Sequence, residues 1–381
     1  MGSATWVMCM TLAVALFCAP FAARAQEVVA EPPAPKIQLA ILLDTSGSMS
    51  GLIEQAKAQL WKIVNEFATT TKDGKAPEFE VALYHYGTPS LGKDTGYVRM
   101  ILPLTTDLDK VSEELFALTT NGGDEYCGTV IKAATEQLSW SASDEDLKVI
   151  VIAGNEPFTQ GEVDYRKACP AAVAKGVIVN TIHCGSYEEG VNGHWRDGAV
   201  LADGKYMNIY HNAKAVHVAA PQDAEIARLG VELNATYVAY GAQRQARAER
   251  QREQDANAAR MGGGSTVQRA VSKSNAFYRN AEWDLVDAVR EDKVKLDDVK
   301  DEDLPEAMRD MTPEQREAYV AEQSAKRAEL QTQINDLNDA RKEYVAAERK
   351  KLAADGKDTL DKVLISAMRE QAEARDFQVG E

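Results

Sequence analysis

Between residues 37 and 242, runs of apolar residues alternate with segments of helical spacing. The apolar runs that carry the pattern are 37–43 (IQLAILL), 148–153 (KVIVIA) and 177–182 (VIVNTI). Nearly unbroken apolar runs are typical of strands that are buried on both faces, as in a parallel sheet. Helical spacing follows the first run over residues 50–67 and the second over residues 165–175. The alternation predicts a doubly wound, mostly parallel α/β sheet.

Further segments extend this pattern along the same stretch of chain. Strands are predicted over 79–86 and 98–104, and helices over 106–118, from 124 to about 140, and over 222–234. Thr106 and Asp107 supply a helix N-cap, and Gly176 ends the helix over 165–175. We expect the helix over 222–234 and a last strand near Thr236–Tyr240 to close the α/β domain, which is assigned to residues 37–242.

The composition changes at residue 243, after which Ala, Glu, Gln, Arg and Lys dominate and an all-α region is predicted to the end of the chain at residue 381. Glycines at 262–264 interrupt it. Residues 312–315 (TPEQ) combine an N-cap threonine, a proline at the first helical position and a capping-box glutamine, and so open a long helix. Leu330, Ile334, Leu337 and Tyr344 then recur at coiled-coil spacing. Packing within a helical hairpin or bundle and dimerisation through this stripe are both compatible with the pattern.

The first residues resemble a secretory signal. An apolar run over 6–17 is followed by Pro20 and an A-x-A sequence at residues 23–25. We expect a signal peptide over residues 1–25 and cleavage near Ala25, so that the protein is exported to the periplasm or secreted. An uncleaved anchor is the alternative, because residues 6–23 are just long enough to span a bilayer. Residues 26–36, which include the proline-rich segment 31–35, are assigned as a linker.

Charge narrows the classes of partner. The formal net charge of −16 makes nucleic acid and anionic lipid poor partners and is compatible with cations, basic proteins or simple solubility. Removal of the signal peptide leaves Cys127, Cys169 and Cys184 in an oxidising compartment. Their spacing does not fit a zinc site. A disulfide between Cys169 and Cys184 is the preferred pairing.

Chemistry is concentrated directly after the first predicted strand, where residues 44–48 read DTSGS. Ligands of open α/β sheets bind at the carboxyl ends of the strands. The carboxylate of Asp44 and the hydroxyls of Ser46 and Ser48 are hard oxygen donors, suited to Mg²⁺ and also to Mn²⁺ or Ca²⁺. No nucleophile elbow, zincin, phosphate-loop or dinucleotide motif accompanies them, so we expect a protein that is not an enzyme.

With this motif in place, residues of about 36–242 resemble a von Willebrand factor A (VWA) domain, and D-x-S-x-S resembles that family's metal-ion-dependent adhesion site (MIDAS). The resemblance implies that Asp44, Ser46 and Ser48 are first-loop ligands of a divalent cation. It also implies that a threonine from a second loop and an aspartate from a third complete the site, and that a carboxylate of a partner protein binds the ion.

The second and third loops depart from the family pattern. Gly122 and Gly123 are followed by Asp124 where the family has threonine, and Thr129 lies later, inside the predicted helix. The third loop reads AGNEP over 153–157 in place of T-D-G, so that Asn155 or Glu156 has to serve. Asp124 adds a negative charge where the family has a neutral threonine, and Asn155 removes a negative charge where the family has an aspartate. We therefore expect a variant site with preserved total charge and an altered partner preference; loss of the metal is the alternative.

Three functional hypotheses follow from these features. In the first, an exported VWA-domain protein binds another protein through a metal-assisted surface at the carboxyl edge of the sheet. In the second, the helical half carries a structural or assembly role and the VWA domain is a metal-free scaffold. A metal-dependent hydrolase is the third, and it lacks any sequence motif in its support.

Overall fold

The computed structural model describes residues 34–210, 217–351 and 360–380, together with Gly2, and side chains are not described for residues 349–350. Residues Ala34–Glu381 form one compact unit. The predicted signal peptide over 1–25 lies outside the described residues, as does the linker up to residue 33. No helix in the described part of the chain is both long and apolar enough to cross a membrane.

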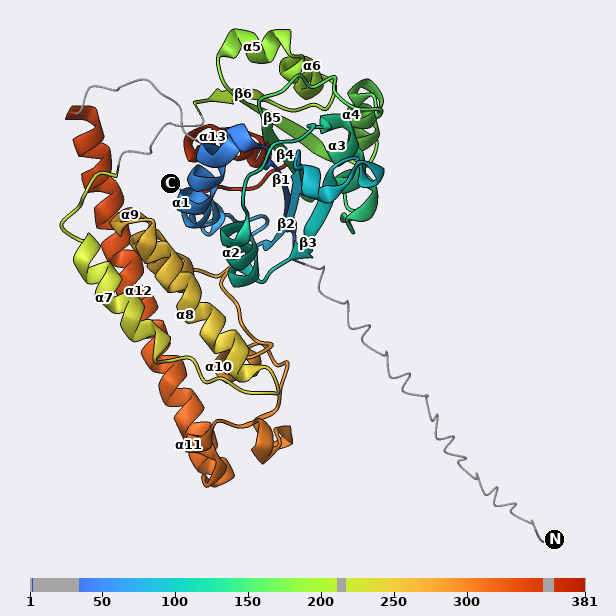
Figure 1. Cartoon of the computed structure of the whole chain (residues 1–381). Coiled ribbons are helices and arrows are strands. Elements are labelled where there is room, and N and C mark those ends of the chain that lie inside the picture. The colour runs from blue at the N-terminus through green and yellow to red at the C-terminus, as the bar shows by residue number, and fades with distance from the viewer. Residues whose placement is uncertain (1, 3–33, 211–216, 352–359, 381) are drawn as a thin grey trace. The chain divides into compact units, whose positions relative to one another are not determined.

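A six-stranded sheet forms the centre of the α/β part (Figure 1). Its strands are β1 (Lys36–Asp44), β2 (Glu78–Tyr86), β3 (Val98–Thr105), β4 (Leu147–Gly154), β5 (Ile178–Cys184) and β6 (Tyr206–Ile209). They lie in the order β3-β2-β1-β4-β5-β6, and every neighbouring pair is parallel except β2 and β3. The doubly wound, mostly parallel sheet predicted from the sequence is confirmed. The short edge strand β6 was not predicted.

Helices cover both faces of this sheet (Figure 1). On one face, α1 (Ser50–Phe67) and α2 (Leu108–Ala117) pack against the odd-numbered residues of β1, such as Leu39 and Leu43. On the other, α3 (Cys127–Gln137) and α4 (Tyr165–Val173) pack against Ala40 and Leu42. Alternate residues of β1 therefore belong to two hydrophobic cores, one on each face of the sheet, and this explains why the sequence of the strand is continuously apolar. Two short helices, α5 (Tyr187–Asn192) and α6 (Trp195–Val200), follow β5 and were not predicted.

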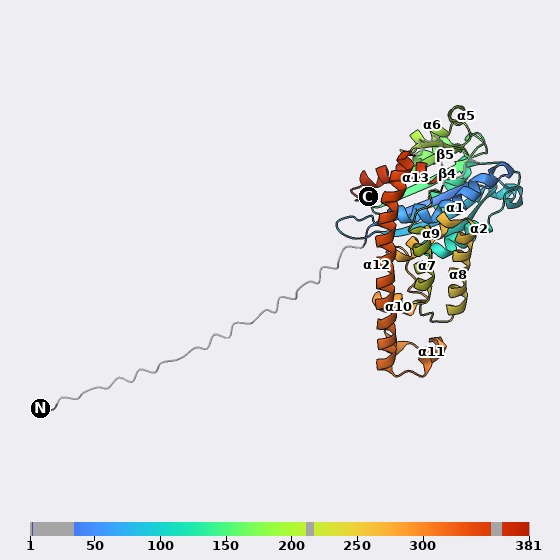
Figure 2. The ribbon, with the colours of Figure 1, turned by 90° about the vertical axis from the view of Figure 1, so that its left-hand side faces the viewer.

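A bundle of helices extends from the α/β part (Figure 2). It consists of α7 (Asp223–Asn234), α8 (Arg244–Arg260), α9 (Gly263–Ser274) and the long helix α12 (Pro313–Lys351). The capping box predicted at the start of α12 is present, because Thr312 N–H donates to Gln315 Oε1 at 2.9 Å and Gln315 N–H donates to Thr312 Oγ1 at 3.3 Å. Leu330 and Ile334 are buried against α7 and α9. Leu337 is partly buried against the same core, whereas Tyr344 is exposed, so only the first part of the predicted stripe packs inside the chain.

Shorter elements connect the bundle helices. Helices α10 (Leu285–Arg290) and α11 (Glu306–Arg309) pack with α12 in a separate small core. The single-turn 3₁₀ helices are Gly47–Met49, Pro89–Leu91, Lys93–Thr95, Leu296–Asp298 and Asp301–Asp303. A buried ion pair joins the bundle to the α/β part, with Arg269 Nη1 on α9 2.7 Å from Asp109 Oδ1 on α2. Both side chains are almost fully buried, so removal of either would leave an uncompensated charge.

The packing of α7 differs from our prediction for residues 222–234. We expected this helix to close the α/β domain, but its apolar residues Ile226, Leu229 and Leu233 pack against α9 and α12. The sheet is instead completed by the last helix of the chain, α13 (Leu360–Glu373), which packs against α1 with Leu364 and Met368. Residue 242 is therefore a boundary of composition, and the packing does not change there.

The disulfide predicted between Cys169 and Cys184 is wrong, because neither of these cysteines, nor Cys127, is disulfide-bonded. The physical reason is their position in the fold. Cys169 lies in the core beneath α3 and α4, whereas Cys184 lies in the core on the other face of the sheet. A pairing of these two side chains would have to pass through the sheet.

Candidate metal site

The site begins where β1 ends. The side chain of Asp44 is fully buried, and its Oδ1 accepts a hydrogen bond of 2.7 Å from the backbone N–H of Ser46. Thr45 fixes the turn, because its N–H and its hydroxyl both donate to Tyr86 O, at 2.9 and 3.0 Å. The chain then enters the 3₁₀ turn at Gly47–Met49 and helix α1. This geometry directs Asp44, Ser46 and Ser48 toward the carboxyl edge of the sheet.

The two serines connect the first loop to the third. Ser46 Oγ lies 3.1 Å from Ser48 Oγ, and Ser48 Oγ donates to Asn155 Oδ1 at 3.3 Å. Asn155 directly follows β4, and its carbonyl oxygen lies 3.2 Å from His183 Nε2. Burial lowers the pKa of His183, and its other ring nitrogen, Nδ1, lies 3.0 Å from Ser186 O, so the ring connects the loops that follow β4 and β5. The structure therefore brings together four of the predicted residues.

A fifth oxygen donor at the site was missed by sequence reasoning. Glu125 is 3% exposed, and a Cβ atom built on Gly87 would lie 2.9 Å from Glu125 Cγ and 2.8 Å from Asp44 Oδ1. The two carboxylates therefore meet beside Gly87, whose φ of +81° is suited to glycine. The backbone N–H of Glu125 donates to Gln160 Oε1 at 3.1 Å, which anchors the second loop to the third.

The electrostatics of this carboxylate pair are unfavourable in the absence of a cation. Burial, followed by the neighbouring Glu125 carboxyl, raises the pKa of Asp44 well above its usual range. Burial likewise raises the pKa of Glu125. Asp44 Oδ2 and Glu125 Oε2 are buried and have no hydrogen-bond partner. Two adjacent, desolvated carboxylates with unpartnered oxygens are stabilised either by protons or by a positive charge between them.

The remaining predicted residues lie around this pair. Asp124 is exposed and makes no described polar contact with Asp44, Ser46 or Ser48, so its role as a ligand stays a prediction. Glu156 is half-buried, and its Oε2 accepts from Gln160 Nε2 at 3.3 Å. The charge of Glu156 contributes to the raised pKa of Glu125, which places it near the site. The second-loop carboxylate that the structure brings to Asp44 is thus Glu125.

The missing third-loop aspartate has a structural counterpart in Gly154 and Tyr86. A Cβ built on Gly154 would lie 3.2 Å from Asp44 Oδ2 but only 2.6 Å from Tyr86 Oη. The hydroxyl of Tyr86 is fully buried and donates to Ala153 O at 3.0 Å. The tyrosine therefore fills the space that a side chain at position 154 would enter.

The donor set fits a divalent cation. Asp44, Glu125, Ser46, Ser48 and Asn155 present carboxylate, hydroxyl and amide oxygens, which are the ligands that Mg²⁺, Mn²⁺ and Ca²⁺ prefer. The unpartnered oxygens of Asp44 and Glu125 show that the protein atoms alone do not satisfy the site. In the described part of the chain, no cluster of three or more His, Cys, Asp or Glu side chains is arranged to hold a metal ion. Serine and amide oxygens would therefore have to be among the ligands.

A doubly wound α/β fold with D-x-S-x-S at the end of its first strand is the arrangement expected of the VWA class of domains. Comparison with known families agrees, because residues 38–196 match the model of the von Willebrand factor type A domain. The chain therefore contains a VWA domain. No curated protein matches the chain.

Several solved structures are similar to the α/β part. BatB from Bacteroides thetaiotaomicron is 19% identical, with 45% of this chain and 90% of that one covered and a TM-score of 0.35. The SpRpn10 VWA domain is also 19% identical, over 46% and 88% of the two chains, with a TM-score of 0.34. Proximal thread matrix protein 1 from the mussel byssus, with a zinc-occupied MIDAS motif, is 13% identical over 46% and 41%, with a TM-score of 0.35.

Proposed function

We propose that the chain is an exported binding protein that engages another protein through a divalent-metal-assisted surface at the carboxyl edge of the sheet. VWA domains commonly mediate protein–protein interaction through a MIDAS. The observation that carries the proposal is the buried pair Asp44 and Glu125, whose oxygens Oδ2 and Oε2 have no partner. Such a pair costs free energy in the folded protein unless protons or a cation neutralise its charge.

The residues that would hold the cation are Asp44, Ser46, Ser48, Glu125 and Asn155, and the cation is Mg²⁺, or else Mn²⁺ or Ca²⁺. When bound, the ion supplies a Lewis-acidic position for an oxygen of the partner, such as a carboxylate. The chain's own residues orient the site: Tyr86 fixes the turn after β1, and His183 fixes the loop after β4.

A binding role is favoured over catalysis by the state of the two serines. Their hydroxyls are hydrogen-bonded to each other and to Asn155. Among the described residues, no histidine is a hydrogen-bond partner of either hydroxyl, whereas a nucleophilic serine needs an adjacent base. We therefore propose that the protein is not an enzyme. Dimerisation through the C-terminal helices stays a prediction. Two residues of the stripe expected to mediate it, Leu330 and Ile334, are buried within the chain.

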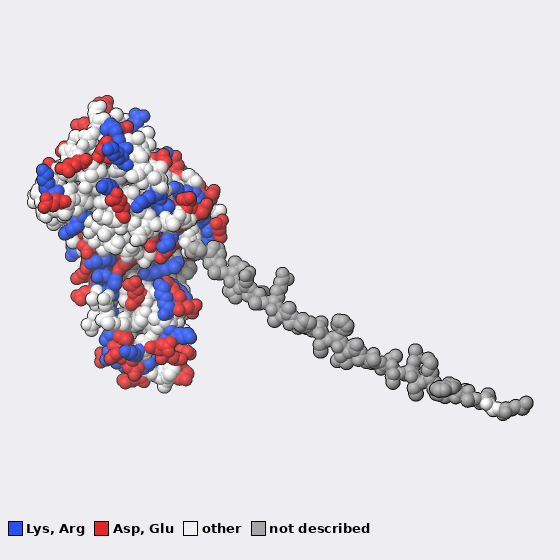
Figure 3. Space-filling view, turned by 90° about the vertical axis from the view of Figure 1, so that its right-hand side faces the viewer, with Lys and Arg blue, Asp and Glu red and all other residues white. Residues whose placement is uncertain are grey.

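Figure 3 shows how charge is distributed on one face of the molecule. Acidic and basic side chains are interspersed there, without a continuous acidic surface, although the net charge of the chain is −16. This face therefore has no extended patch of a single charge that would mark a docking surface for a polyanion or a polycation.

Metal titration of the mature chain (residues 26–381) tests the proposal. Isothermal titration of metal-stripped protein with MgCl₂ and MnCl₂ should show one saturable site in the wild type. Asp44→Ala and Glu125→Gln should abolish the site, whereas Asp124→Ala should weaken it less, because Asp124 is exposed and makes no described polar contact with Asp44, Ser46 or Ser48. Unchanged binding in Asp44→Ala would refute the proposed ligand set.

A second measurement separates the metal edge from the helical part as the surface for partners. Proteins of the cell envelope are cross-linked to immobilised mature chain with Mg²⁺ or with EDTA, and the bound species are compared between wild type and Asp44→Ala. Loss of the same species in EDTA and in Asp44→Ala supports recognition through the metal edge. Retention under both conditions would assign partner binding to the helical part and leave the VWA domain as a scaffold.

A further inference from the structure

Three helices of the bundle bring a lysine, an asparagine and an aspartate together. Lys273 lies in the last turn of α9, Asn234 is the last residue of α7, and Asp255 lies on α8. Lys273 Nζ is 2.7 Å from Asn234 Oδ1 and 2.7 Å from Asp255 Oδ2, and it also donates to Gly230 O at 3.1 Å. The amine of Lys273 is therefore held against the side-chain carbonyl group of an amide.

The amide is hydrogen-bonded to the same carboxylate oxygen. Asn234 Nδ2 donates to Asp255 Oδ2 at 2.7 Å. A lysine ammonium only donates and an ionised carboxylate only accepts, so these two partners determine the orientation of the amide. Asp255 Oδ2 is consequently in contact with two nitrogen atoms, Lys273 Nζ and Asn234 Nδ2.

The surroundings of Lys273 suit its amine to act as a nucleophile. The residue is 2% exposed, and burial lowers its pKa to about 8, although the charge of Asp255 acts in the opposite direction. An amine attacks a carbonyl carbon only in its neutral form, and desolvation is one of the ways in which proteins activate a lysine. The neutral form of Lys273 is therefore populated at mildly alkaline pH.

Asp255 is ionised and accepts hydrogen bonds from both nitrogens. Burial alone would raise its pKa, but the charges of Arg269 and Lys273 lower it to about 2. Arg269 Nε lies 2.7 Å from Asp255 Oδ1, and Arg269 Nη1 lies 2.7 Å from Asp109 Oδ1. This arginine therefore remains as a counter-charge for both carboxylates when Lys273 carries no charge.

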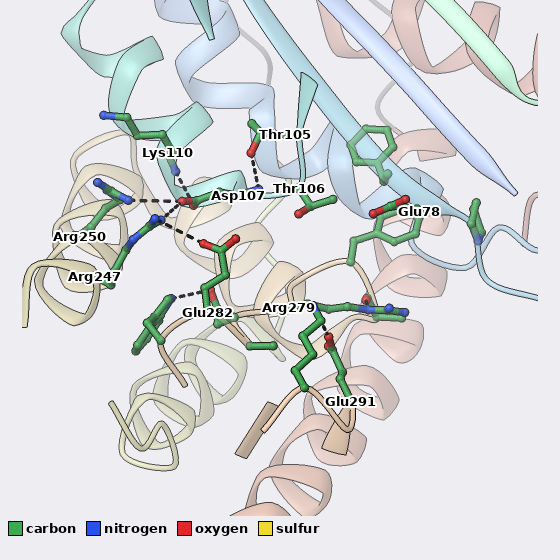
Figure 4. Close-up of a pocket in the computed structure, with 18 residues that line it drawn as sticks. Glu78, Thr105, Thr106, Asp107, Lys110, Arg247, Arg250, Arg279, Glu282 and Glu291 are labelled. Carbon is green, nitrogen blue, oxygen red and sulfur yellow. Dashed lines mark hydrogen bonds and ion pairs between the residues drawn. The ribbon is translucent and has the colours of Figure 1, made fainter. Parts of the chain in front are cut away.

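Other cations near α8 lack this arrangement. In the cavity lined by α2 and α8, which Figure 4 shows, Lys110 Nζ lies 2.7 Å from a carboxylate oxygen of Glu113 and 2.7 Å from one of Glu114. These are ion pairs between half-exposed side chains, and pairs of this kind contribute little to stability. Lys273 differs because it is buried and because one of its partners is an amide carbonyl group.

We propose that Lys273 and Asn234 form an intramolecular isopeptide bond, with Asp255 as the catalytic residue. Lys273 Nζ attacks Asn234 Cγ, so that a C–N bond forms between them, and the bond from Cγ to Nδ2 breaks. Asp255 Oδ2 accepts the proton that Nζ loses and passes it to Nδ2, which leaves as ammonia. The step is a transamidation, in which the chain modifies itself once without an oxidant, a reductant or a second substrate.

The geometry lowers the barrier to this reaction and gives it a direction. Groups that are held in contact in a reactive orientation reach effective concentrations of about 10⁵–10⁸ M. Asn234 and Asp255 are half-buried, so the ammonia has a route to solvent, and its release into dilute solution favours the product. The bond would tie α7 to α9 and close the chain between them into a loop that contains α8. The inference does not depend on the metal edge, because all three residues lie in the bundle.

Peptide mapping of the mature chain (residues 26–381), performed before and after incubation at mildly alkaline pH, tests the proposal. Trypsin releases the peptides 229–244 and 270–279, which contain Asn234 and Lys273. The bond should join them into one branched species that is lighter than their sum by one ammonia, with no cleavage after Lys273. Mapping is needed because cyclisation of a glutamine at the N-terminus also releases ammonia. Unjoined peptides alone, with cleavage after Lys273, would overturn the proposal.

Two variants and a control assign the chemistry. Asp255→Asn should reduce the yield of branched peptide at least tenfold, whereas wild-type yield would refute the role of Asp255. Lys273→Arg keeps a cation in the cluster and should abolish the species. Lys72→Arg is the control, because Lys72 is also buried but its Nζ donates to the backbone and carboxylate oxygens of Glu145, both at 2.7 Å. It should give wild-type yield. The map of the wild type alone decides whether the bond forms, so the test does not depend on the folding of any variant.

Discussion

Helix α13 is the element whose removal tests the architecture most directly. It lies at the end of a region whose composition is that of the bundle, yet in Figures 1 and 2 it lies beside the α/β part. Its buried side chains belong to the core that α1 also lines. Ending the chain at Lys351 removes Leu360, Leu364, Met368 and Phe377, each of which is 4% exposed or less. We expect this truncation to unfold the α/β part.

The magnitude follows from burial. Full burial of one large apolar side chain stabilises a fold by about 1.5–3 kcal/mol, so that four such side chains contribute roughly 6–12 kcal/mol. A typical domain has a net stability of about 5–15 kcal/mol. The truncation also breaks a buried amide pair, in which Asn180 Nδ2 donates to Gln371 Oε1 at 2.9 Å and Gln371 Nε2 donates to Asn180 Oδ1 at 2.8 Å. The loss is thus comparable with the whole stability of the domain.

Urea unfolding of chains 26–381 and 26–351, followed by circular dichroism and tryptophan fluorescence, measures the effect. Met368→Ala in the full chain gives a graded version and should cost about 2–5 kcal/mol, because a buried methionine leaves a cavity. Glu373→Ala, on the exposed side of the same helix, should stay within about 0.5 kcal/mol of the wild type. Equal urea midpoints for the two chain lengths would show that α13 is dispensable, and the reasoning from burial would fail.

Two further predictions concern the metal edge. Burial raises the pKa of Asp44 and Glu125 in the folded state, so the folded, metal-free protein holds protons that the unfolded chain releases above about pH 4. Its stability should therefore fall as pH rises through the raised pKa values. The stability of the Glu125→Gln variant should fall less over the same pH range, and the difference in urea midpoint between this variant and the wild type should shrink on addition of Mg²⁺. Parallel pH profiles of stability for the two proteins would contradict this. Gly154→Ala should cost about 1–3 kcal/mol, because its Cβ would lie 2.6 Å from Tyr86 Oη, and the cost should shrink in a Tyr86→Phe background. An equal cost in both backgrounds, measured by thermal unfolding, would count against that contact.

The first loop of the site was predictable because its signals are local. The continuous apolar run of β1 identifies a strand buried on both faces, and D-x-S-x-S directly after it lies at the edge where ligands bind. The second loop was less predictable. Asp124 and Glu125 are adjacent acids, and Glu125 turns inward in a loop that packs closely on Gly87, where a Cβ built on Gly123 would lie 2.6 Å from the Gly87 carbonyl oxygen. A tertiary contact of this kind leaves no periodic signal in the sequence.

Two of the errors in the α/β part have a similar origin. The strand expected near Thr236–Tyr240 is a further error, because only Ala239 pairs there, in an isolated bridge with Asp284. Helix α7 and helix α13 are both amphipathic, so periodicity predicts that each has a buried face but does not identify the surface that covers it. Cys169 and Cys184 lie on elements that are consecutive in the chain, yet α4 packs on one face of the sheet, and Cys184 points to the other. The alternation of side chains along a strand, applied to β5, would have shown that Cys184 shares a face with Ile182.

The placement of α13 has a consequence for how partners reach the molecule. Because the last helix belongs to the α/β part, residues 217–351 form an insertion between β6 and α13, and both ends of that insertion return to the VWA domain. The insertion meets the sheet at the edge that contains Glu78 and Thr105, whereas Asp44 and Asn155 lie at the opposite edge. In Figure 1 the bundle accordingly extends away from α5 and α6, which follow the carboxyl end of β5. A protein bound at the proposed metal edge would therefore leave the bundle accessible to solvent.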